Sequence, residues 1–232
     1  MESEYDSLSE KSILKFAKRL EGATLRNILS EQQVKEFNDK YYPNREKQNK
    51  GRFGQKVEEF YFLIKNNSRS EPDFTDAEIE LKVTPLKKLK NGNLAPKERL
   101  VCNIINFNEI VSEKFETSSF MKKNKRTLII RYIDPLDKEV HELDYQFHSV
   151  EFLELKKSKY YSQFKKDWNK IIGKIKEGKA HELSESDTCY LGACTKGADS
   201  NSLRNQPFSK EPAMQRAFSF KSQFMKKLLN QD

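Results

Sequence analysis

Cysteine is scarce in this chain, and the cysteines that are present do not suggest cross-linking. Cys102, Cys189 and Cys194 are odd in number and form no CxxC pair, so we expect reduced thiols rather than a disulfide framework. A zinc site drawn from Cys189, Cys194 and His181 would have a spacing that matches no ligand pattern of zinc proteins. The sequence therefore argues against a disulfide-stapled fold and against a zinc site.

Long apolar runs and nucleophile motifs are also missing. The longest apolar runs, such as LIIRYI at residues 128–133, fall far short of the ~20 residues that a membrane span needs. The acidic start MESEYDSLSE does not resemble a signal peptide. His141, His148 and His181 have no companion Ser or Cys motif, which disfavours a Ser or Cys hydrolase. We expect a protein of a prokaryotic-type cytoplasm with no membrane partner.

Positive charge and aromatic residues are what the chain has in quantity. Its 232 residues include 43 Lys and Arg against 35 Asp and Glu, which gives a formal net charge of +8. This excess favours a polyanionic partner, above all nucleic acid. Charged residues make up 34% of the chain, yet 16 Phe and 9 Tyr provide core anchors that a disordered polyelectrolyte lacks. We therefore expect a folded, basic, nucleic-acid-binding protein.

Apolar residues recur every three or four positions in several segments, which predicts helices. The recurrence over residues 7–40 indicates a helical N-terminal layer. A second helical pattern begins near residue 51 and carries Glu58. A third covers residues 161–178 and ends at Gly178, a residue typical of helix C-termini.

Four segments rich in β-formers lie between these helices. They are residues 77–85, 99–106, 126–133 and 140–150, and RAFSF near the C-terminus is a final strand. Pro85 is expected to end the first strand because proline cannot donate to a ladder, and FMKKNKR before the third is expected to be a lysine-rich loop. The whole chain, residues 1–232, is predicted to be one α+β domain, with a helical layer over about 1–45 and a core over about 50–232 that holds a short mixed sheet flanked by helices.

The stretch from Asp73 to Lys82 contains the candidate catalytic residues. Because side chains alternate along a strand, Glu80 and Lys82 leave one face together while Leu81 points to the other. Asp73 enters from the preceding turn, so the two carboxylates and the Leu81 carbonyl can converge on a hard cation such as Mg²⁺. A lysine beside that metal can orient or deprotonate a water for metal-assisted hydrolysis of a phosphodiester. The same alternation is also typical of a solvated strand face.

Glu58 is a candidate third carboxylate on the helix that begins near residue 51. Its alternative interpretation is an exposed helix residue paired with a lysine. The residues alone leave both interpretations open.

Several motifs occur together, in order, and carry a family resemblance. They are GRFGQKVEEFYF, PDFTDAEIELKVTPL, ERLVCNI, FETSSFMKKNKR, KKDWNKIIGKIKEGKAHEL, YLGACTKGA and QRAFSFKSQFM. Together they resemble the MutH/Sau-type family of GATC endonucleases, and within it the N-terminal catalytic domain of the Sau-type type II restriction enzymes. The resemblance implies a PD-(D/E)xK nuclease core, which agrees with the α+β prediction.

The resemblance also implies roles for individual residues. Asp73, Glu80 and Lys82 fall on the family's catalytic signature, and Glu58 falls on a helical glutamate that helps to place the metal. Lys123 falls on the lysine that approaches the scissile phosphate, and its neighbour Lys122 leaves this assignment uncertain by one residue.

Further positions are implied to contact DNA. Lys50, Thr195 and Lys196 fall on DNA-contacting positions of the family. Ser219 falls where MutH has a tyrosine that senses adenine methylation, and Cys194 falls where MutH has an arginine. These two departures weaken the case for methylation sensing, so we expect adenine methylation to change cleavage only slightly.

Other basic residues complete the predicted DNA-binding set. Lys122 and Lys125 belong to a group of lysines suited to neutralising phosphates beside the cleft. Base readout is expected from the loop after residue 190 and from the last strand, which includes Arg216.

The sequence thus predicts a Mg²⁺-dependent endonuclease domain that cuts duplex DNA at GATC. We expect it to be the N-terminal half of a longer restriction enzyme, with a second regulatory domain or homodimerisation on DNA as further interactions. The alternatives are a MutH-like nicking enzyme of mismatch repair and a non-cutting GATC-binding module. The presence of Glu58, Asp73, Glu80 and Lys82 argues against the binding module.

Overall fold

The computed structural model describes residues 4–43, 53–65, 71–137, 139–197 and 201–230. The chain divides into two compact units. The first unit consists of Met1–Lys97 with Thr127–Leu153, and the second of Glu98–Arg126 with Glu154–Asp232. Each unit is therefore assembled from two separate chain segments, and the single domain expected from the sequence stays a prediction.

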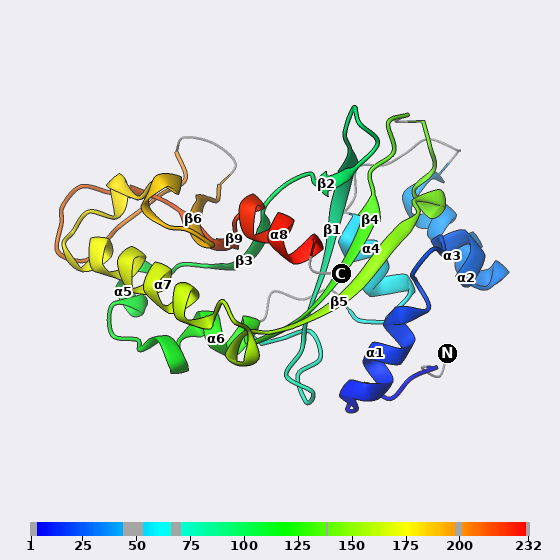
Figure 1. Cartoon of the computed structure of the whole chain (residues 1–232), viewed down its shortest axis with the longest axis horizontal. Helices are drawn as coiled ribbons and strands as arrows, with labels where there is room; N and C mark the ends of the chain where they lie inside the picture. Colours follow the sequence, from blue (N-terminus) through cyan, green and yellow to red (C-terminus); the bar gives the residue numbers. More distant parts are fainter. Residues whose placement is uncertain (1–3, 44–52, 66–70, 138, 198–200, 231–232) are drawn as a thin grey trace. The chain divides into compact units, whose positions relative to one another are not determined.

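Helices form the N-terminal part of the first unit (Figure 1). They are α1 (Glu10–Lys18), α2 (Leu25–Ile28), α3 (Glu31–Tyr41) and α4 (Phe53–Phe60). Each of the first three begins after a hydroxyl side chain that accepts a hydrogen bond from the first turn, namely Ser9, Thr24 and Ser30, as is usual for N-caps. The predicted helical layer is confirmed, although it is broken into three pieces.

A four-stranded sheet completes the first unit. Its strands are β1 (Glu80–Lys88), β2 (Leu94–Pro96), β4 (Arg126–Ile133) and β5 (Phe147–Glu154), in the order β2-β1-β4-β5. Because β1 runs antiparallel to β2 and parallel to β4, the sheet is mixed, as predicted.

One face of this sheet is buried under the helical layer. Leu81 on β1 and Leu128 and Ile130 on β4 belong to a single apolar cluster that includes side chains of α1, α3 and α4. Helix α4 packs against β1, and a Cβ on Gly54 would lie 3.4 Å from the Cβ of Val83. The other face of β1 is thus the one that carries Glu80 and Lys82.

Pro85 does not end the first strand, which corrects the prediction. β1 continues to Lys88, and Pro85 pairs with Tyr132 of β4. The Pro85 carbonyl accepts a hydrogen bond from the Lys97 backbone N–H at 3.0 Å, just past the β1–β2 register, which ends at Leu86. Since the proline lies at the end of that ladder, its missing N–H removes at most one bond.

Two other segments also differ from the prediction. The strand expected at residues 140–150 is β5, which begins only at Phe147, because residues 142–144 form a 3₁₀ turn capped by the His141 imidazole. The segment that was expected to be a lysine-rich loop instead forms helix α6 (Ser119–Asn124). The N-cap Ser118 accepts a hydrogen bond from the Met121 N–H at 3.2 Å. A serine at this position is a helix start signal, but the lysines that follow it led to the prediction of a loop.

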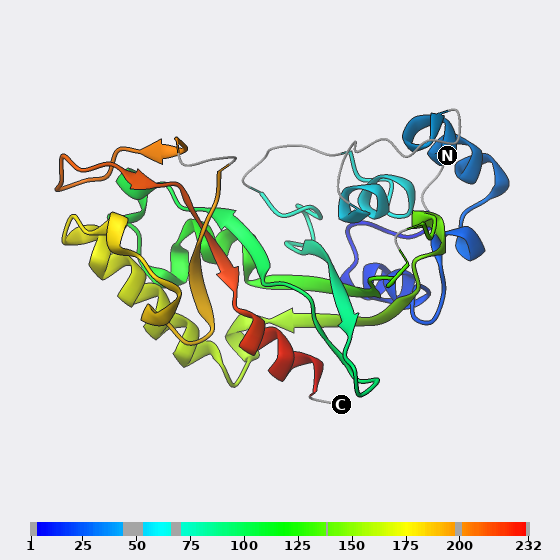
Figure 2. The same cartoon turned by 90° about the horizontal axis from the view of Figure 1, so that it is seen from above.

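The second unit contains a three-stranded antiparallel sheet and several helices (Figure 2). The sheet has the order β3-β9-β6, with β3 (Leu100–Ile104), β9 (Arg216–Phe220) and β6 (Leu191–Thr195). The helices are α5 (Phe107–Ile110), α6, α7 (Tyr161–Lys176) and α8 (Ser222–Leu229), and β7 (Leu203–Arg204) pairs with β8 (Ala213–Met214). Short 3₁₀ turns of this unit lie at Phe115–Thr117, Leu155–Lys157, Ala180–Glu182 and Glu185–Asp187.

The predicted stop after α7 is confirmed at Gly178. Its φ of 72° is in the left-handed region, which glycine adopts without steric cost. A Cβ here would lie 2.6 Å from the Phe208 carbonyl oxygen. Glycine is therefore required both by the backbone and by the neighbouring chain.

The architecture is α+β, with a mixed sheet flanked by helices, as expected of a PD-(D/E)xK-like fold. Among the described helices, none combines the length and apolar character needed to cross a bilayer.

Candidate active site

A tight turn brings Asp73 beside the start of β1. Phe74 and Ile79 exchange backbone hydrogen bonds of 2.9 and 3.1 Å, which closes the turn between them. The Asp73 Oδ2 then accepts the backbone N–H of Leu81 at 2.9 Å. The carboxylate of Asp73 is thereby fixed against the backbone of β1.

Glu80 and Lys82 form an ion pair on the sheet face opposite Leu81. The Lys82 Nζ donates to the Glu80 Oε1 at 2.5 Å. The Glu80 side chain is 2% exposed and that of Lys82 is 21% exposed. A buried carboxylate of this kind needs a cation or donors near it, and Lys82 supplies one while still reaching solvent.

The neighbouring strand places a second ion pair on the same face. In the parallel β1–β4 register, Glu80 lies beside Thr127, and Thr84 lies beside Arg131. Arg131 is 2% exposed and its NH2 donates to the Glu151 carboxylate at 2.6 Å. Arg131 was not among the residues expected from the sequence, although an arginine inside the apolar run LIIRYI was a usable signal.

Glu58 lies on α4, one turn after Gly54, and is half-buried. Residues four apart share a helix face, so Glu58 is on the side of α4 that approaches β1. Its neighbour Glu59 is bonded to Lys40 and to the Tyr41 hydroxyl. The role of Glu58 as a third carboxylate stays a prediction.

A buried ion pair holds α4 from its other side. Lys56 is 1% exposed and pairs with Glu142, which is 7% exposed. The Tyr42 hydroxyl donates to the same carboxylate at 3.1 Å, and the Lys56 Nζ lies 4.3 Å from the centroid of the Tyr41 ring. The signal for Lys56 was its position on the apolar stripe of the helix, between Phe53 and Val57.

The residues of β1 and its preceding turn suit a hard metal ion chemically. Asp73, Glu80 and the Leu81 carbonyl offer only oxygen, the donor that Mg²⁺ prefers. Asp73 uses Oδ2 for the Leu81 N–H, which orients the carboxylate. Within the described residues, no three His, Cys, Asp or Glu side chains lie close enough together to hold a metal, so joint ligation by Glu58, Asp73 and Glu80 stays a prediction.

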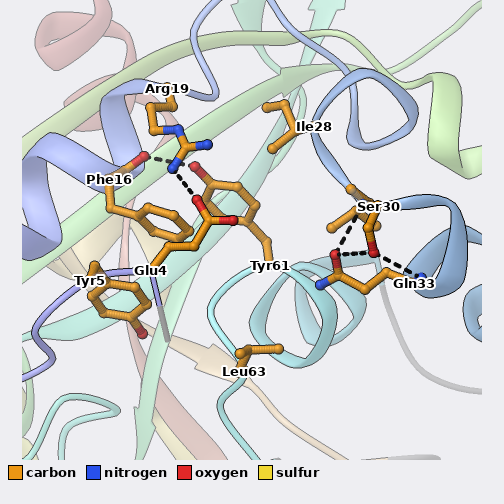
Figure 3. Close-up of a pocket in the computed structure, with 10 residues that line it drawn as sticks. Glu4, Tyr5, Phe16, Arg19, Ile28, Ser30, Gln33, Tyr61 and Leu63 are labelled. Carbon is orange, nitrogen blue, oxygen red and sulfur yellow. Dashed lines mark hydrogen bonds and ion pairs between the residues drawn. The ribbon is translucent and has the colours of Figure 1, made fainter. Parts of the chain in front are cut away.

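A hollow of about 210 Å³ in the first unit contains none of these residues. It is lined mainly by the helical layer, and Figure 3 shows Arg19 paired with Glu4 at its edge, at 2.6 Å. The Tyr61 hydroxyl donates to the Phe16 carbonyl at 2.7 Å and closes one wall. The hollow is therefore separate from the candidate catalytic residues.

Among the described residues, the basic residues predicted to approach DNA are Lys122, Lys123, Lys125, Lys196 and Arg216, and they lie in the second unit. Helix α6 carries Lys122 and Lys123. Lys122 is exposed, whereas Lys123 and the C-cap Lys125 are half-buried. The Asn124 amide donates to the Asn103 side-chain oxygen of β3 at 2.9 Å. This bond fixes the C-terminal end of α6 against the end of β3.

Thr195, Lys196 and Arg216 are brought together at one end of the β6–β9 pair. Thr195 is the direct antiparallel partner of Arg216. The Lys196 backbone N–H donates to the Gln215 carbonyl at 2.7 Å, which continues the ladder by one step. These three residues, separated by about twenty positions in the sequence, therefore form one group.

Two other residues that were predicted to contact DNA, Ser219 and Lys50, do not belong to this group. Ser219 is completely buried, and a contact with DNA would require a rearrangement of this part of β9. It pairs with Gly192, where an added Cβ would lie 3.2 Å from both Glu185 and Lys221. Lys50 lies outside the described residues.

Asp167 on α7 anchors the start of β6 and was not singled out by sequence. Its carboxylate is 3% exposed and accepts the backbone N–H groups of Cys189, Tyr190 and Leu191 at 3.0, 2.6 and 2.9 Å. Gln163 donates a fourth hydrogen bond at 2.8 Å. A charged residue next to the buried Trp168 was the signal available in the sequence.

Comparison with known proteins agrees with these observations. Residues 62–167 match the family described as DNA mismatch repair enzyme MutH. The chain is 46% identical over 184 residues to the type II restriction enzyme Sau3AI of Staphylococcus aureus. That alignment covers 79% of this chain but only 37% of the length of the relative. Together with the mixed sheet flanked by helices, these two matches show that the chain belongs to the MutH/Sau-type family.

Proposed function

We propose that this chain is a Mg²⁺-dependent endonuclease domain that hydrolyses phosphodiester bonds of duplex DNA at GATC. The observation that carries the proposal is the arrangement on β1, where Asp73 is tied to the Leu81 N–H and Lys82 is paired with the buried Glu80. The similarity to the restriction enzyme Sau3AI supports the same reaction class.

Asp73, Glu80 and the Leu81 carbonyl would hold the metal, with Glu58 as a further carboxylate. When bound, Mg²⁺ supplies Lewis acidity toward water and the phosphodiester. The hydrogen bond from the Leu81 N–H orients Asp73, so that its carboxylate does not have to be ordered when DNA binds.

Lys82 has a separate role in the proposed reaction. Its ammonium compensates the charge of Glu80, and its partial exposure allows Nζ to hold a proton or orient a water. The basic residues of the second unit, which include Lys122, Lys123, Lys125 and Lys196, would contact DNA phosphates. Such contacts position a duplex without reading its sequence.

A MutH-like nicking enzyme is the second candidate, and the match of residues 62–167 to the MutH family favours it. The two candidates differ in their product, since a nickase leaves an open circle and a restriction enzyme gives a linear molecule. A GATC-binding module without cleavage would give neither product. A second regulatory domain or homodimerisation on DNA is part of the same proposal.

Plasmid cleavage tests the proposal directly. We would incubate supercoiled plasmids that carry one GATC, no GATC, or one adenine-methylated GATC with the protein in Mg²⁺, in Ca²⁺ and in EDTA. Linear product mapped to GATC, formed in Mg²⁺ alone, is expected. Cleavage of the plasmid without GATC at an equal rate, or cleavage in EDTA, would overturn the assignment, and persistent open circles would favour the nickase.

A further inference from the structure

Arg216 occupies the last row of the β6–β9 pair on the side of the sheet covered by α6. Side chains two apart on a strand share a face, so Arg216 lies on the same face as Phe218. The Phe218 ring packs against Phe120 of α6 with centroids 5.2 Å apart. The residue directly opposite Arg216 on β6 is Thr195.

The backbone of Arg216 is held from both sides. Its carbonyl accepts the Ile105 N–H at 2.9 Å, and the preceding Gln215 accepts the Lys196 N–H at 2.7 Å. Arg216 is therefore presented from a paired strand rather than from a loop. A side chain on such a strand can be placed with the precision that recognition of a base requires.

The guanidinium of Arg216 has no carboxylate partner within the described residues. The one hydrogen bond that its guanidinium makes to the described part of the chain is long, from NH1 to the Ala193 carbonyl at 3.4 Å. Its Nε is buried without a hydrogen-bond acceptor. Burial lowers the pKa of this guanidinium, so the surrounding protein does not compensate its charge well.

A half-buried arginine of this kind is costly for the free protein, because its donors have lost water without gaining acceptors. Arg131 also has a buried Nε without an acceptor, but its NH2 pairs with Glu151, whereas no carboxylate pairs with Arg216 within the described residues. The missing acceptors at Arg216 are therefore those of a ligand. The adjacent Lys196 and the lysines of α6 indicate that this ligand is a polyanion.

We propose that Arg216 is a specificity-determining residue whose guanidinium donates to O6 and N7 of guanine in the major groove. The inference rests on the proposed function, because it takes GATC duplex DNA as the ligand. Two parallel donors of one guanidinium match the two acceptors of guanine, and this is the commonest base-specific contact of arginine.

A phosphate contact is the competing role for the same charge. Phosphates are reached by exposed side chains, such as Lys122 on the neighbouring helix. Arg216 instead has its Nε buried against the sheet, which restricts both its reach and its orientation. Restricted reach favours a base edge beside the strand; a guanidinium also binds phosphate through two donors, so the experiment below has to separate the two roles.

The test compares binding of the full chain to two duplexes in Ca²⁺. One carries GATC and the other carries 7-deazaguanine at the same guanine, which removes the N7 acceptor. The wild-type protein should bind the unmodified duplex roughly threefold or more tightly, because 7-deazaguanine keeps O6 and lacks one of the two acceptors of the bidentate contact. R216K keeps the positive charge but lacks the two parallel donors of the guanidinium. This variant should therefore bind the two duplexes nearly equally.

R204K is the matched control. Arg204 is exposed on β7 and bonds to its own strand and to Gln215, so this variant should keep the wild-type preference for guanine over 7-deazaguanine. Circular dichroism and thermal melting of R216K should match wild type.

Each contrary result has a distinct meaning. If R216K kept the wild-type preference, or weakened binding to both duplexes equally in the manner of a lost phosphate contact, Arg216 would not read guanine. If the wild-type protein showed no preference for GATC over a scrambled duplex, the proposed function itself would fail.

Discussion

The Asp73 carboxylate accepts the Leu81 backbone N–H at 2.9 Å. This bond joins the turn before β1 to the strand itself, beside the Lys82–Glu80 ion pair. The catalytic groups proposed here are therefore oriented by backbone that is already paired with β4. Such preorganisation lowers the cost of assembling the site when substrate binds.

Replacing Asp73 by asparagine should abolish cleavage and leave the fold intact. The asparagine oxygen can still accept the Leu81 N–H, but the negative charge for the metal is lost. We expect cleavage in Mg²⁺ to fall by at least about 10²-fold, a loss typical when one electrostatic group of an active site is removed, and DNA binding in Ca²⁺ to change little. Asp76→Asn, at an exposed position of the same turn, is the control and should cleave normally. Near-normal cleavage by Asp73→Asn would refute the assignment.

Lys56→Met should destabilise the protein strongly, because it leaves the Glu142 carboxylate buried without its cation. Breaking a buried ion pair from one side costs roughly 3–5 kcal/mol. The control is Lys40→Met, which removes an exposed partner of Glu59. Urea unfolding measures the free energy of unfolding of both variants, and the loss should be larger for Lys56→Met. Equal losses in the two variants would show that burial does not matter here.

Asp167→Asn should loosen the start of β6. Asparagine retains one acceptor oxygen in place of a carboxylate that accepts three backbone N–H groups. Hydrogen bonds to charged groups contribute about 1.5–3 kcal/mol each, so we expect a clear drop in melting temperature and weaker DNA binding through Thr195 and Lys196. Asn169→Ala, exposed on the same helix, should change neither, and hydrogen exchange at residues 189–191 would locate the effect.

Stability should fall at alkaline pH through Tyr5. Burial raises the pKa of Tyr5 from 10.0 to about 12, and its hydroxyl donates to the Phe62 carbonyl at 2.8 Å. A folded-state pKa above the unfolded value gives stability that is complete below the unfolded pKa and is lost as pH rises through the folded one. Unfolding free energies of the wild type and Tyr5→Phe across this pH interval should converge. Parallel curves for the two proteins would contradict the prediction.

Lys196→Ala should weaken binding to GATC duplexes and flatten its dependence on salt. Each lost phosphate contact reduces the slope of log K against log salt by about 0.9. Lys210→Ala, an exposed lysine of the second unit outside the predicted set, serves for comparison. An unchanged slope for Lys196→Ala would remove this residue from the DNA-contacting group.

The sequence by itself determined the elements with strong local signals. The alternation of Glu80, Leu81 and Lys82 gave the correct strand and the correct faces, because a strand with one apolar face has only one register that buries it. Apolar stripes likewise predicted the helical layer and α7. The ordered motifs also led to the family, which the later comparisons confirmed.

Only the tertiary structure decided which charged residues are buried and what they contact. Lys56 pairs with Glu142, and Arg131 pairs with Glu151. Asp167 accepts hydrogen bonds from the backbone that follows Thr188. Each looks in the sequence like one more charge in a chain that is 34% charged. The partners lie about twenty to ninety residues away, and no local pattern encodes such a distance. Burying these charges is favourable only when folding brings the partners together, so their roles are properties of the assembled fold.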